Sequence, residues 1–268
     1  LTSGVDCQGD RTEWQAVAHG RDTRRWVVDH GVIWSHISEQ GTWLELNKLL
    51  AREWPAEVGV ARQPDGLAID GNAYTSDVWE WVKTRPKSKV IMVRGVGSPR
   101  APVIGRVAGK TKDGRSQKAY RSRFFNVGVS PMKMALYQSL PKTDPLGRAY
   151  IGLPQGLEDD YYEQLTSERR TEVRKRDGTM EWRWGIVEAG QRNEMLDTFL
   201  YAEAAAHKLG WREWSDAAWD RRAAELEAPP KEAQLDLEDL PLAPVAAKAP
   251  AQPTKSGSFA SAAAALNR

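Results

Sequence analysis

The sequence predicts an α/β domain in which helices flank a mixed β-sheet. Short apolar runs with the period of strands alternate with segments whose apolar residues repeat at helical spacing. A chain of 268 residues, 41% of them hydrophobic, is long enough to bury a substantial core. Two of the strand-like runs end at an aspartate, which places acidic side chains at the ends of predicted elements.

The first half of the chain supplies the centre of the predicted sheet. Three strands open it, and Gly31 is expected to interrupt the third. Thr42 is the expected N-cap of the first helix. In the second helix, Val78, Trp79 and Val82 are expected to face inward. The predicted order is β-β-β-α-β-α-β, which is typical of RNase H-like folds. The seven elements are residues 1–7, 12–20, 24–34, 42–52, 67–70, 75–84 and 89–94.

The second half adds helices and a hairpin. Residues 95–123 are rich in Gly, Pro, Lys and Arg, which indicates a mobile loop or an extended β excursion. Asp177-Gly178 lies between two strand-like runs and predicts a β-hairpin. From residue 229 the hydrophobic residues are too sparse for a core, so we expect a folded domain over 1–228 and a disordered, flexible tail over 229–268. The remaining predicted strands are 124–129, 149–153, 171–176 and 179–187, and the remaining helices are 130–140, 159–167, 193–209 and 214–227.

Composition excludes several classes of protein. No apolar stretch approaches the length that spans a membrane, and no secretory signal is visible, so a cytoplasmic setting is expected. The single cysteine, Cys7, excludes an internal disulfide framework and a cysteine-based zinc site. The chain has no initiator Met, and we expect it to derive from a larger protein. Seven of the twelve tryptophans fall in predicted elements and are expected in the core: Trp14, Trp26, Trp34, Trp43, Trp54, Trp79 and Trp81.

Three aspartates, Asp6, Asp70 and Asp197, are the candidate catalytic residues and metal ligands. The first two end strand-like runs and the third lies in a predicted helix, so they can converge only in three dimensions. A pair of divalent ions that hydrolyses a phosphodiester needs oxygen ligands of this kind, with water completing each shell. The alternative is that Asp6 and Asp70 form turns and that Asp197 is a solvated helix residue. Three further acids, Asp10, Glu168 and Glu194, are secondary candidates for the site. As structural residues, Asp10 would form a turn, Glu168 would pair with Arg169 or Arg170, and Glu194 would place a negative charge at a helix N-terminus.

Basic residues concentrate in two places. Between Arg94 and Arg123 there are nine Lys or Arg residues and one acid, and a second basic run precedes the predicted hairpin turn. Lys and Arg neutralise phosphates without reading sequence, so both places predict contact with DNA, and a solvated loop is the alternative. Residues 105–111 resemble a phosphate loop, but three residues instead of four separate the glycines, so no nucleotide cofactor is expected. The candidate DNA-binding residues are Arg94, Arg100, Arg106, Lys110, Lys112, Arg115, Lys118, Arg121, Arg174, Lys175 and Arg176.

Four segments carry a family resemblance: GVDCQGDR at 4–11, IDGNAYT at 69–75, YYEQLTSE at 161–168 and NEMLD at 193–197. In this order and spacing they resemble the nuclease domain of a tailed-bacteriophage terminase large subunit of the lambda-like (GpA) family. A weaker similarity lies at 126–133. Cys7 stands where an apolar residue is usual in such proteins, a departure that leaves the chemistry untouched.

The resemblance implies a packaging endonuclease that cuts concatemeric double-stranded phage DNA with two Mg²⁺ or Mn²⁺ ions at an RNase H-like site. Asp6 would bridge the ions, Asp70 would complete one shell and Asp197 the other. The ATPase motor of such enzymes has no counterpart in this sequence. The implied partners are double-stranded DNA, the small terminase subunit and the portal ring, in the host cytoplasm and without a membrane. Two alternatives stay open: a non-catalytic module that binds DNA or the portal, and another RNase H-like nuclease of the resolvase or transposase type.

Overall fold

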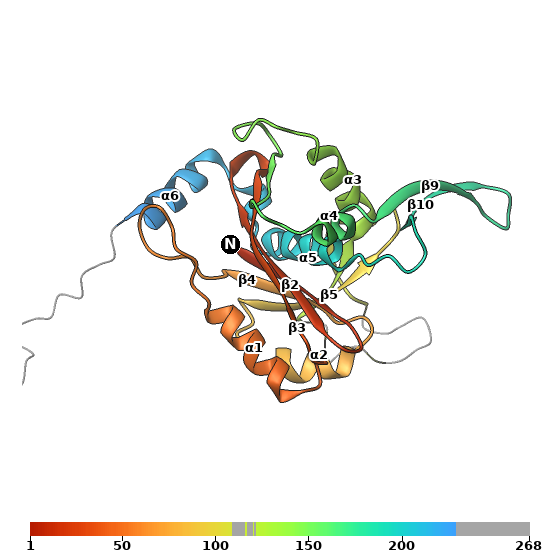
Figure 1. Cartoon of the computed structure of the whole chain (residues 1–268), viewed down its shortest axis with the longest axis horizontal. Helices are drawn as coiled ribbons and strands as arrows, with labels where there is room; N and C mark the ends of the chain where they lie inside the picture. The colour runs from red at the N-terminus through yellow and green to blue at the C-terminus, as the bar shows by residue number, and fades with distance from the viewer. Residues whose placement is uncertain (109–115, 117–119, 121, 229–268) are drawn as a thin grey trace, which may run out of the picture. The chain divides into compact units, whose positions relative to one another are not determined.

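Three antiparallel strands open the chain in the computed structural model, which describes residues 1–108, 116, 120 and 122–228 (Figure 1). They are β1 (Thr2–Cys7), β2 (Thr12–His19) and β3 (Arg25–Ile33). Parallel strands extend the sheet on the other side of β1: β4 (Gly66–Asp70), then β5 (Val90–Val96) and β7 (Phe124–Gly128). With β6 (Ile104–Arg106) and β8 (Ile151–Gly152) at its edges, the eight-stranded sheet has the order β6-β7-β5-β4-β1-β2-β3-β8.

The helices cover both faces of this sheet. α1 (Gln40–Ala51) and α2 (Thr75–Val82) pack on one face, and α3 (Val129–Ser139), α4 (Asp159–Leu165) and α5 (Glu194–Lys208) pack on the other (Figure 1). The order β-β-β-α-β-α-β through β5, with β2 antiparallel to both of its neighbours, confirms the predicted RNase H-like fold class. Three further helical elements are η1 (Arg21–Thr23) between β2 and β3, and η2 (Trp211–Glu213) and α6 (Asp216–Glu227) after α5.

The alternation of side chains along the strands divides the core into two clusters. Val5 of β1 and Ile69 of β4 belong to the cluster under α1 and α2, whereas Ala68 belongs to the cluster under α5. Because successive side chains of a strand point to opposite faces, Asp6 and Asp70 point to the α5 face. The polar ends of these two strands therefore lie under the same helix.

α5 lies directly against β1. A Cβ atom on Gly4 would lie 1.8 Å from the carbonyl oxygen of Thr198 and 2.6 Å from the amide nitrogen of Ala202, distances that no side chain can occupy. Twelve of the fifteen residues of α5 are buried, and several of them are alanines, whose small side chains allow a close approach. Glycine at position 4 is thus a condition for the position of α5.

Two local predictions were wrong. α1 begins at Gln40, and Thr42 is not its N-cap: it lies inside the first turn, buried, with its hydroxyl donating to a backbone carbonyl at 2.8 Å. β3 runs through Gly31 without interruption. The irregularity instead lies in its partner β2, where the pairing register shifts between Ala16 and Val17.

The tryptophans divide by position. Trp14, Trp54 and Trp81 are buried as predicted, and Trp81 is fully buried, whereas Trp79 is only partly buried. The prediction for Trp34 was wrong, because its side chain is 74% exposed just after the end of β3. Trp26 and Trp43 are partly buried.

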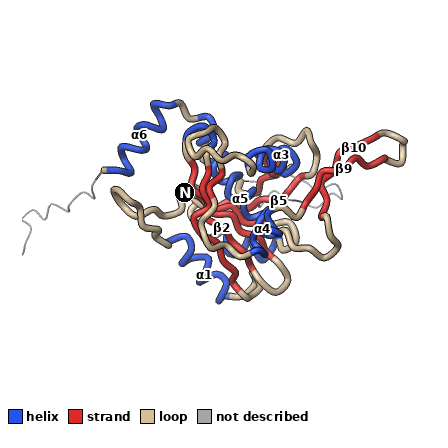
Figure 2. Tube along the Cα trace, turned by 45° about the horizontal axis from the view of Figure 1, so that its top comes forward, coloured by secondary structure: helices blue, strands red, loops and turns tan. Residues whose placement is uncertain are grey.

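The predicted hairpin is confirmed. β9 (Glu168–Arg174) and β10 (Met180–Ile186) form a separate two-stranded sheet that projects from the rest of the domain (Figures 1 and 2). Gly178 in the turn has φ +83°, a left-handed conformation that glycine adopts without strain. Asp177 accepts hydrogen bonds from the backbone and hydroxyl of Thr179, which fixes the turn.

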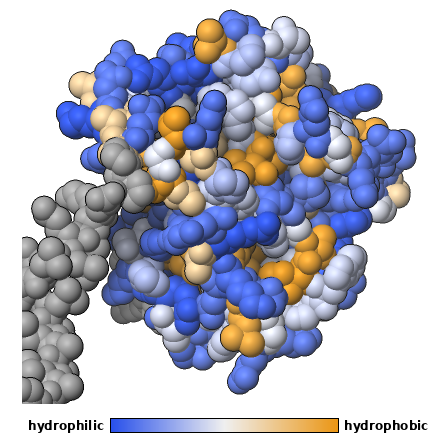
Figure 3. Space-filling model, turned by 60° about the vertical axis from the view of Figure 1, so that its left-hand side comes forward, coloured by the Kyte–Doolittle hydropathy of each residue, from blue (hydrophilic) through white to orange (hydrophobic). Residues whose placement is uncertain are grey.

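Part of the region from 95 to 123 is a β excursion, because β6 pairs antiparallel with β7. The predicted flexible tail over 229–268 lies outside the described residues. None of the helices in the described part of the chain is long and apolar enough to cross a membrane. On the face shown in Figure 3, hydrophilic residues predominate and hydrophobic residues lie in separate groups among them.

Candidate active site

Two neighbouring parallel strands bring Asp6 and Asp70 together. The register of β1 and β4 pairs Val5 with Ile69, so each aspartate comes directly after this pair, at the same edge of the sheet. Both aspartates are buried, with 5% and 7% of their surface exposed. Their positions at strand ends were predicted, and the pairing of the two strands makes them neighbours.

Asp197 reaches the same place from the first turn of α5. It lines a pocket of about 290 Å³ together with Asp6 and Asp70, and its side chain is 23% exposed. The three predicted aspartates, which come from three different elements, therefore converge. The other residues that line this pocket are Gln8, Asn72, Gly95, Gly97, Val129, Lys133, Glu168, Asn193 and Tyr201.

A buried lysine was not among the predicted site residues. Lys133 of α3 places its Nζ 2.5 Å from Glu168 Oε1 and 3.8 Å from Asp197 Oδ1. Asn193 Nδ2 donates to both of these carboxylates at 3.1 Å, and Gln8 Nε2 donates to Asp6 Oδ2 at 2.6 Å. The carboxylates of the pocket are therefore held in orientation by amide groups and by one ammonium.

Burial and repulsion from neighbouring carboxylates raise the pKa values of all three aspartates. Burial raises the pKa of Asp6 well above its usual range, and the charges of Asp197 and Asp70 raise it further. Burial also raises the pKa of Asp70 to about 7, against hydrogen bonds from the neighbouring backbone that lower it. The pKa of Asp197 rises to about 6, mainly through burial, and the charge of Lys133 limits the rise. Several carboxylates that line one pocket and repel one another favour a cation among them.

The donor set fits a hard divalent ion by its chemistry. Asp6, Asp70 and Asp197 offer only oxygen atoms, which Mg²⁺ and Mn²⁺ prefer, and the pocket has room for water to complete a coordination shell. The part of the chain that the structure describes holds no group of three or more His, Cys, Asp or Glu side chains already arranged as ligands of one ion.

The three secondary acidic candidates differ in whether they line the pocket. Asp10 has a 71% exposed side chain and pairs with Arg11, away from the pocket. Glu168 lines the pocket, and its partner is Lys133, so the alternative pairing with Arg169 or Arg170 was wrong. The third acid, Glu194, begins α5 as expected but points to two arginines outside the pocket.

The candidate DNA-binding residues differ in whether their side chains are exposed. Arg94 is used inside the fold, because its Nε donates to Asn126 at 2.8 Å. Arg123, counted in the basic run, is buried and donates to backbone carbonyls. The exposed cations among the described candidates are Arg100, Arg106, Arg174, Lys175 and Arg176. Five further candidates lie outside the described residues: Lys110, Lys112, Arg115, Lys118 and Arg121.

One protein family matches most of this chain. The model of the family described as terminase large subunit gpA, endonuclease domain, matches residues 1–219. The terminase large subunit of Escherichia phage lambda is 27% identical over 216 residues, which are 76% of this chain and 32% of that protein. The chain thus spans about a third of the length of this relative. A crystal structure of the large terminase nuclease from thermophilic phage G20c aligns with a TM-score of 0.40 and 10% identity, over 76% of this chain and 80% of that chain.

Proposed function

This chain belongs to the endonuclease-domain family of the terminase large subunit gpA, and we propose that it is a divalent-metal-dependent endonuclease that cuts concatemeric double-stranded phage DNA during genome packaging. The observation that carries this proposal is the convergence of Asp6, Asp70 and Asp197 on one pocket. Three carboxylates with raised pKa values in one pocket are costly to the fold unless the site binds a cation.

The residues of the pocket would have three different roles in the proposed reaction. Asp6 at the end of the central strand β1, Asp70 at the end of β4 and Asp197 in α5 would together hold two Mg²⁺ or Mn²⁺ ions. When bound, such ions lower the pKa of the attacking water and neutralise the charge that develops on the phosphate. Gln8 and Asn193 orient Asp6 and Asp197 by donating to their carboxylates. The Lys133 ammonium adds a fixed positive charge to a pocket that must accept an anionic substrate.

The DNA surface would extend from the pocket to the hairpin. A second cavity of about 550 Å³ shares Lys133, Glu168 and Asn193 with the catalytic pocket and continues to residues of β10. On the hairpin, Trp182 is 46% exposed, and the guanidinium of Arg170 lies 4.9 Å from the centre of its ring. Exposed aromatic and cationic side chains of this kind are suited to bases and phosphates.

Cleavage of supercoiled plasmid with Mg²⁺ or Mn²⁺ tests the proposal. Asp6→Asn, Asp70→Asn and Asp197→Asn should each abolish nicking and linearisation while the protein stays folded by circular dichroism. Asp10→Asn is the matched control, because this acid is exposed and lies outside the pocket, and it should cut like the unsubstituted chain. Chelation with EDTA should stop cleavage. Full activity in any of the three pocket variants would remove that residue from the catalytic centre.

Partners and setting belong to the proposal as well. A terminase large subunit would act on double-stranded DNA with the small terminase subunit and the portal ring, in the cytoplasm of the infected host. A protein that bound DNA but cut none with either ion would instead be a non-catalytic assembly module. Preference for branched junctions over linear duplex would favour a nuclease of the resolvase type.

A further inference from the structure

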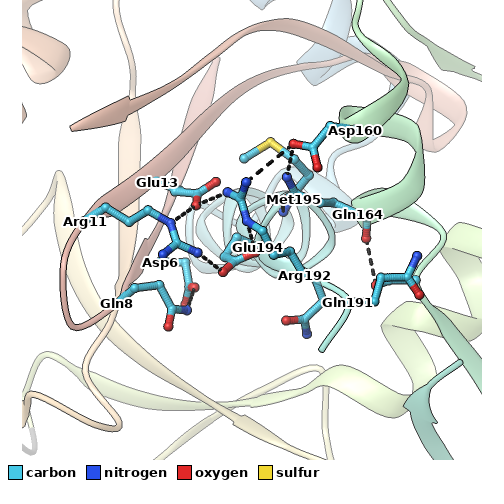
Figure 4. Close-up of polar contacts among 12 residues, drawn as sticks. Asp6, Gln8, Arg11, Glu13, Asp160, Gln164, Gln191, Arg192, Glu194 and Met195 are labelled. Carbon is cyan, nitrogen blue, oxygen red and sulfur yellow. Dashed lines mark hydrogen bonds and ion pairs between the residues drawn. The ribbon is translucent and has the colours of Figure 1, made fainter. Parts of the chain in front are cut away.

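Two arginines and two glutamates connect the start of β2 to the start of α5 (Figure 4). Arg11 donates from Nε to Glu13 Oε1 and from Nη2 to Glu194 Oε1, both at 2.6 Å. Arg192 Nη2 donates to the same Glu13 oxygen, and its Nε lies 3.3 Å from Glu194 Oε2. These four residues form a ring of ionic contacts, called the arginine–glutamate network below, and its two arginines also pair with Asp10 and Asp160 outside the ring.

Stability alone does not account for this network. The side chains of Glu13 and Glu194 are only 1% and 7% exposed, so both charges are removed from water at a high cost. Glu13 Oε2 is buried and accepts no hydrogen bond from the described residues, which adds to that cost. Apolar residues of similar volume would serve a core of this kind at least as well. Unlike apolar contacts, hydrogen-bonded ion pairs fix the relative position and orientation of the two groups that they join.

The position of α5 along its own axis needs such a constraint because of the way the helix packs on β1. At Gly4 the helix lies on bare backbone, and this contact by itself does not stop the helix from sliding along its axis. Farther along α5, Thr2 Oγ1 donates to the carbonyl of Ala202 at 2.8 Å. The arginine–glutamate network constrains the N-terminal end, since its short hydrogen bonds tie the first residue of α5, Glu194, to the β1–β2 connection.

Each side of the network also carries an aspartate of the proposed catalytic site. Asp197 follows Glu194 by three residues, about 4.5 Å along the helix axis. Asp6 and Gln8 lie just before Arg11, on the strand and turn that hold the other side. We propose that the arginine–glutamate network sets the position of Asp197 relative to Asp6, so that Glu194 is a positioning residue of the site. This inference rests on the proposed function.

The same helix offers a matched control. Glu203 is also held between two arginines, with Arg25 Nη1 at 3.3 Å and Arg212 Nη2 at 2.5 Å, and its side chain is 9% exposed. It follows Asp197 by six residues, about 9 Å along the axis. Glu194→Gln and Glu203→Gln thus remove comparable buried charges from the first turn and from the second half of α5, and only the first lies beside the pocket.

The test compares the two variants in the full chain by thermal melting, by calorimetric titration with Mn²⁺ in the absence of DNA, and by plasmid-nicking kinetics. Both should melt at lower temperature. Glu194→Gln should also bind Mn²⁺ roughly tenfold more weakly and lose kcat by about tenfold or more at an unchanged KM for DNA, whereas Glu203→Gln should stay within about twofold on each measure. Arg192→Gln, at a 36% exposed side chain, repeats the test if Glu194→Gln does not fold.

The outcomes separate the two proposals. If Glu194→Gln and Glu203→Gln bind Mn²⁺ and cut DNA equally well, the network is structural only and the inference is overturned while the proposed function stands. If the unsubstituted chain neither binds Mn²⁺ nor nicks plasmid, the proposed function has failed and the inference falls with it.

Discussion

One added methyl group at Gly4 would test the placement of α5, and with it the geometry of the site. In Gly4→Ala the new Cβ would lie 1.8 Å from the Thr198 carbonyl oxygen, whereas ordinary contact begins at 3.4 Å, so the helix must retreat by about 1.6 Å. The obstacle is backbone, which cannot rotate away as a side chain can. We therefore expect a loss of about 3 kcal/mol or more in the free energy of unfolding, the upper end of what overpacking costs.

The same displacement would reach the proposed catalytic pocket. Thr198 is the next residue after Asp197, so the retreat of the helix carries this aspartate away from Asp6. A misplacement of about 1 Å can cost roughly 100-fold in rate, and we expect a loss of that order in plasmid nicking. For a domain of this size, a loss of about 3 kcal/mol corresponds to a fall in Tm of roughly 6–12 °C, which melting by circular dichroism resolves.

Gly41→Ala is the matched control, because a Cβ there would meet nothing within 4 Å. Position 41 lies in the first turn of α1, where alanine is favoured over glycine by about 0.5–1 kcal/mol. This variant should melt at the same or a higher temperature and cut normally. If Gly4→Ala melted and cut like Gly41→Ala, α5 could not lie on β1 as described, and Asp197 would have to leave the proposed site.

Three further predictions concern charge and the last forty residues of the sequence. Burial raises the pKa of Asp70 in the folded state from 3.8 to about 7, so between these pH values the folded state binds more protons than the unfolded state, and stability falls as pH rises. In the absence of divalent ions, the Tm of Asp70→Asn minus the Tm of the unsubstituted chain should therefore increase from pH 4 to pH 8. A difference in Tm that stays constant over this range would contradict the prediction. Replacing Arg174, Lys175 and Arg176 by Ala should reduce the slope of log affinity against log salt by about 0.9 for each phosphate that the variant no longer neutralises, measured by fluorescence anisotropy, and an unchanged slope would take the hairpin off the DNA surface. Deleting residues 229–268 should leave plasmid cleavage unchanged, since their Ala/Pro-rich composition builds no core, and should weaken binding to a portal ring in a pull-down; loss of cleavage would mean that the domain extends further.

Local patterns were enough to predict most of the elements. Strand and helix periods, the Asp177-Gly178 turn and the acids at strand ends are properties of neighbouring residues, so they can be recognised without knowledge of the fold. The order of elements then indicated the RNase H-like sheet, and Asp6, Asp70 and Asp197 could be chosen from 36 acids with the help of a family resemblance. At Thr42 the local signal for a helix start was misleading, because the helix begins two residues earlier and the threonine hydroxyl donates to a backbone carbonyl of the preceding loop.

The tertiary structure decided which side chains meet. Lys133 and Glu168 are 35 positions apart and Arg11 and Glu194 are 183 apart, and no local pattern marks such pairs. Their contact follows from the way α3 and α5 pack on the sheet, which depends on the shape of the whole core. The convergence of three aspartates has the same origin: strand pairing brings two of them together, and a helix resting on the bare backbone of Gly4 brings the third.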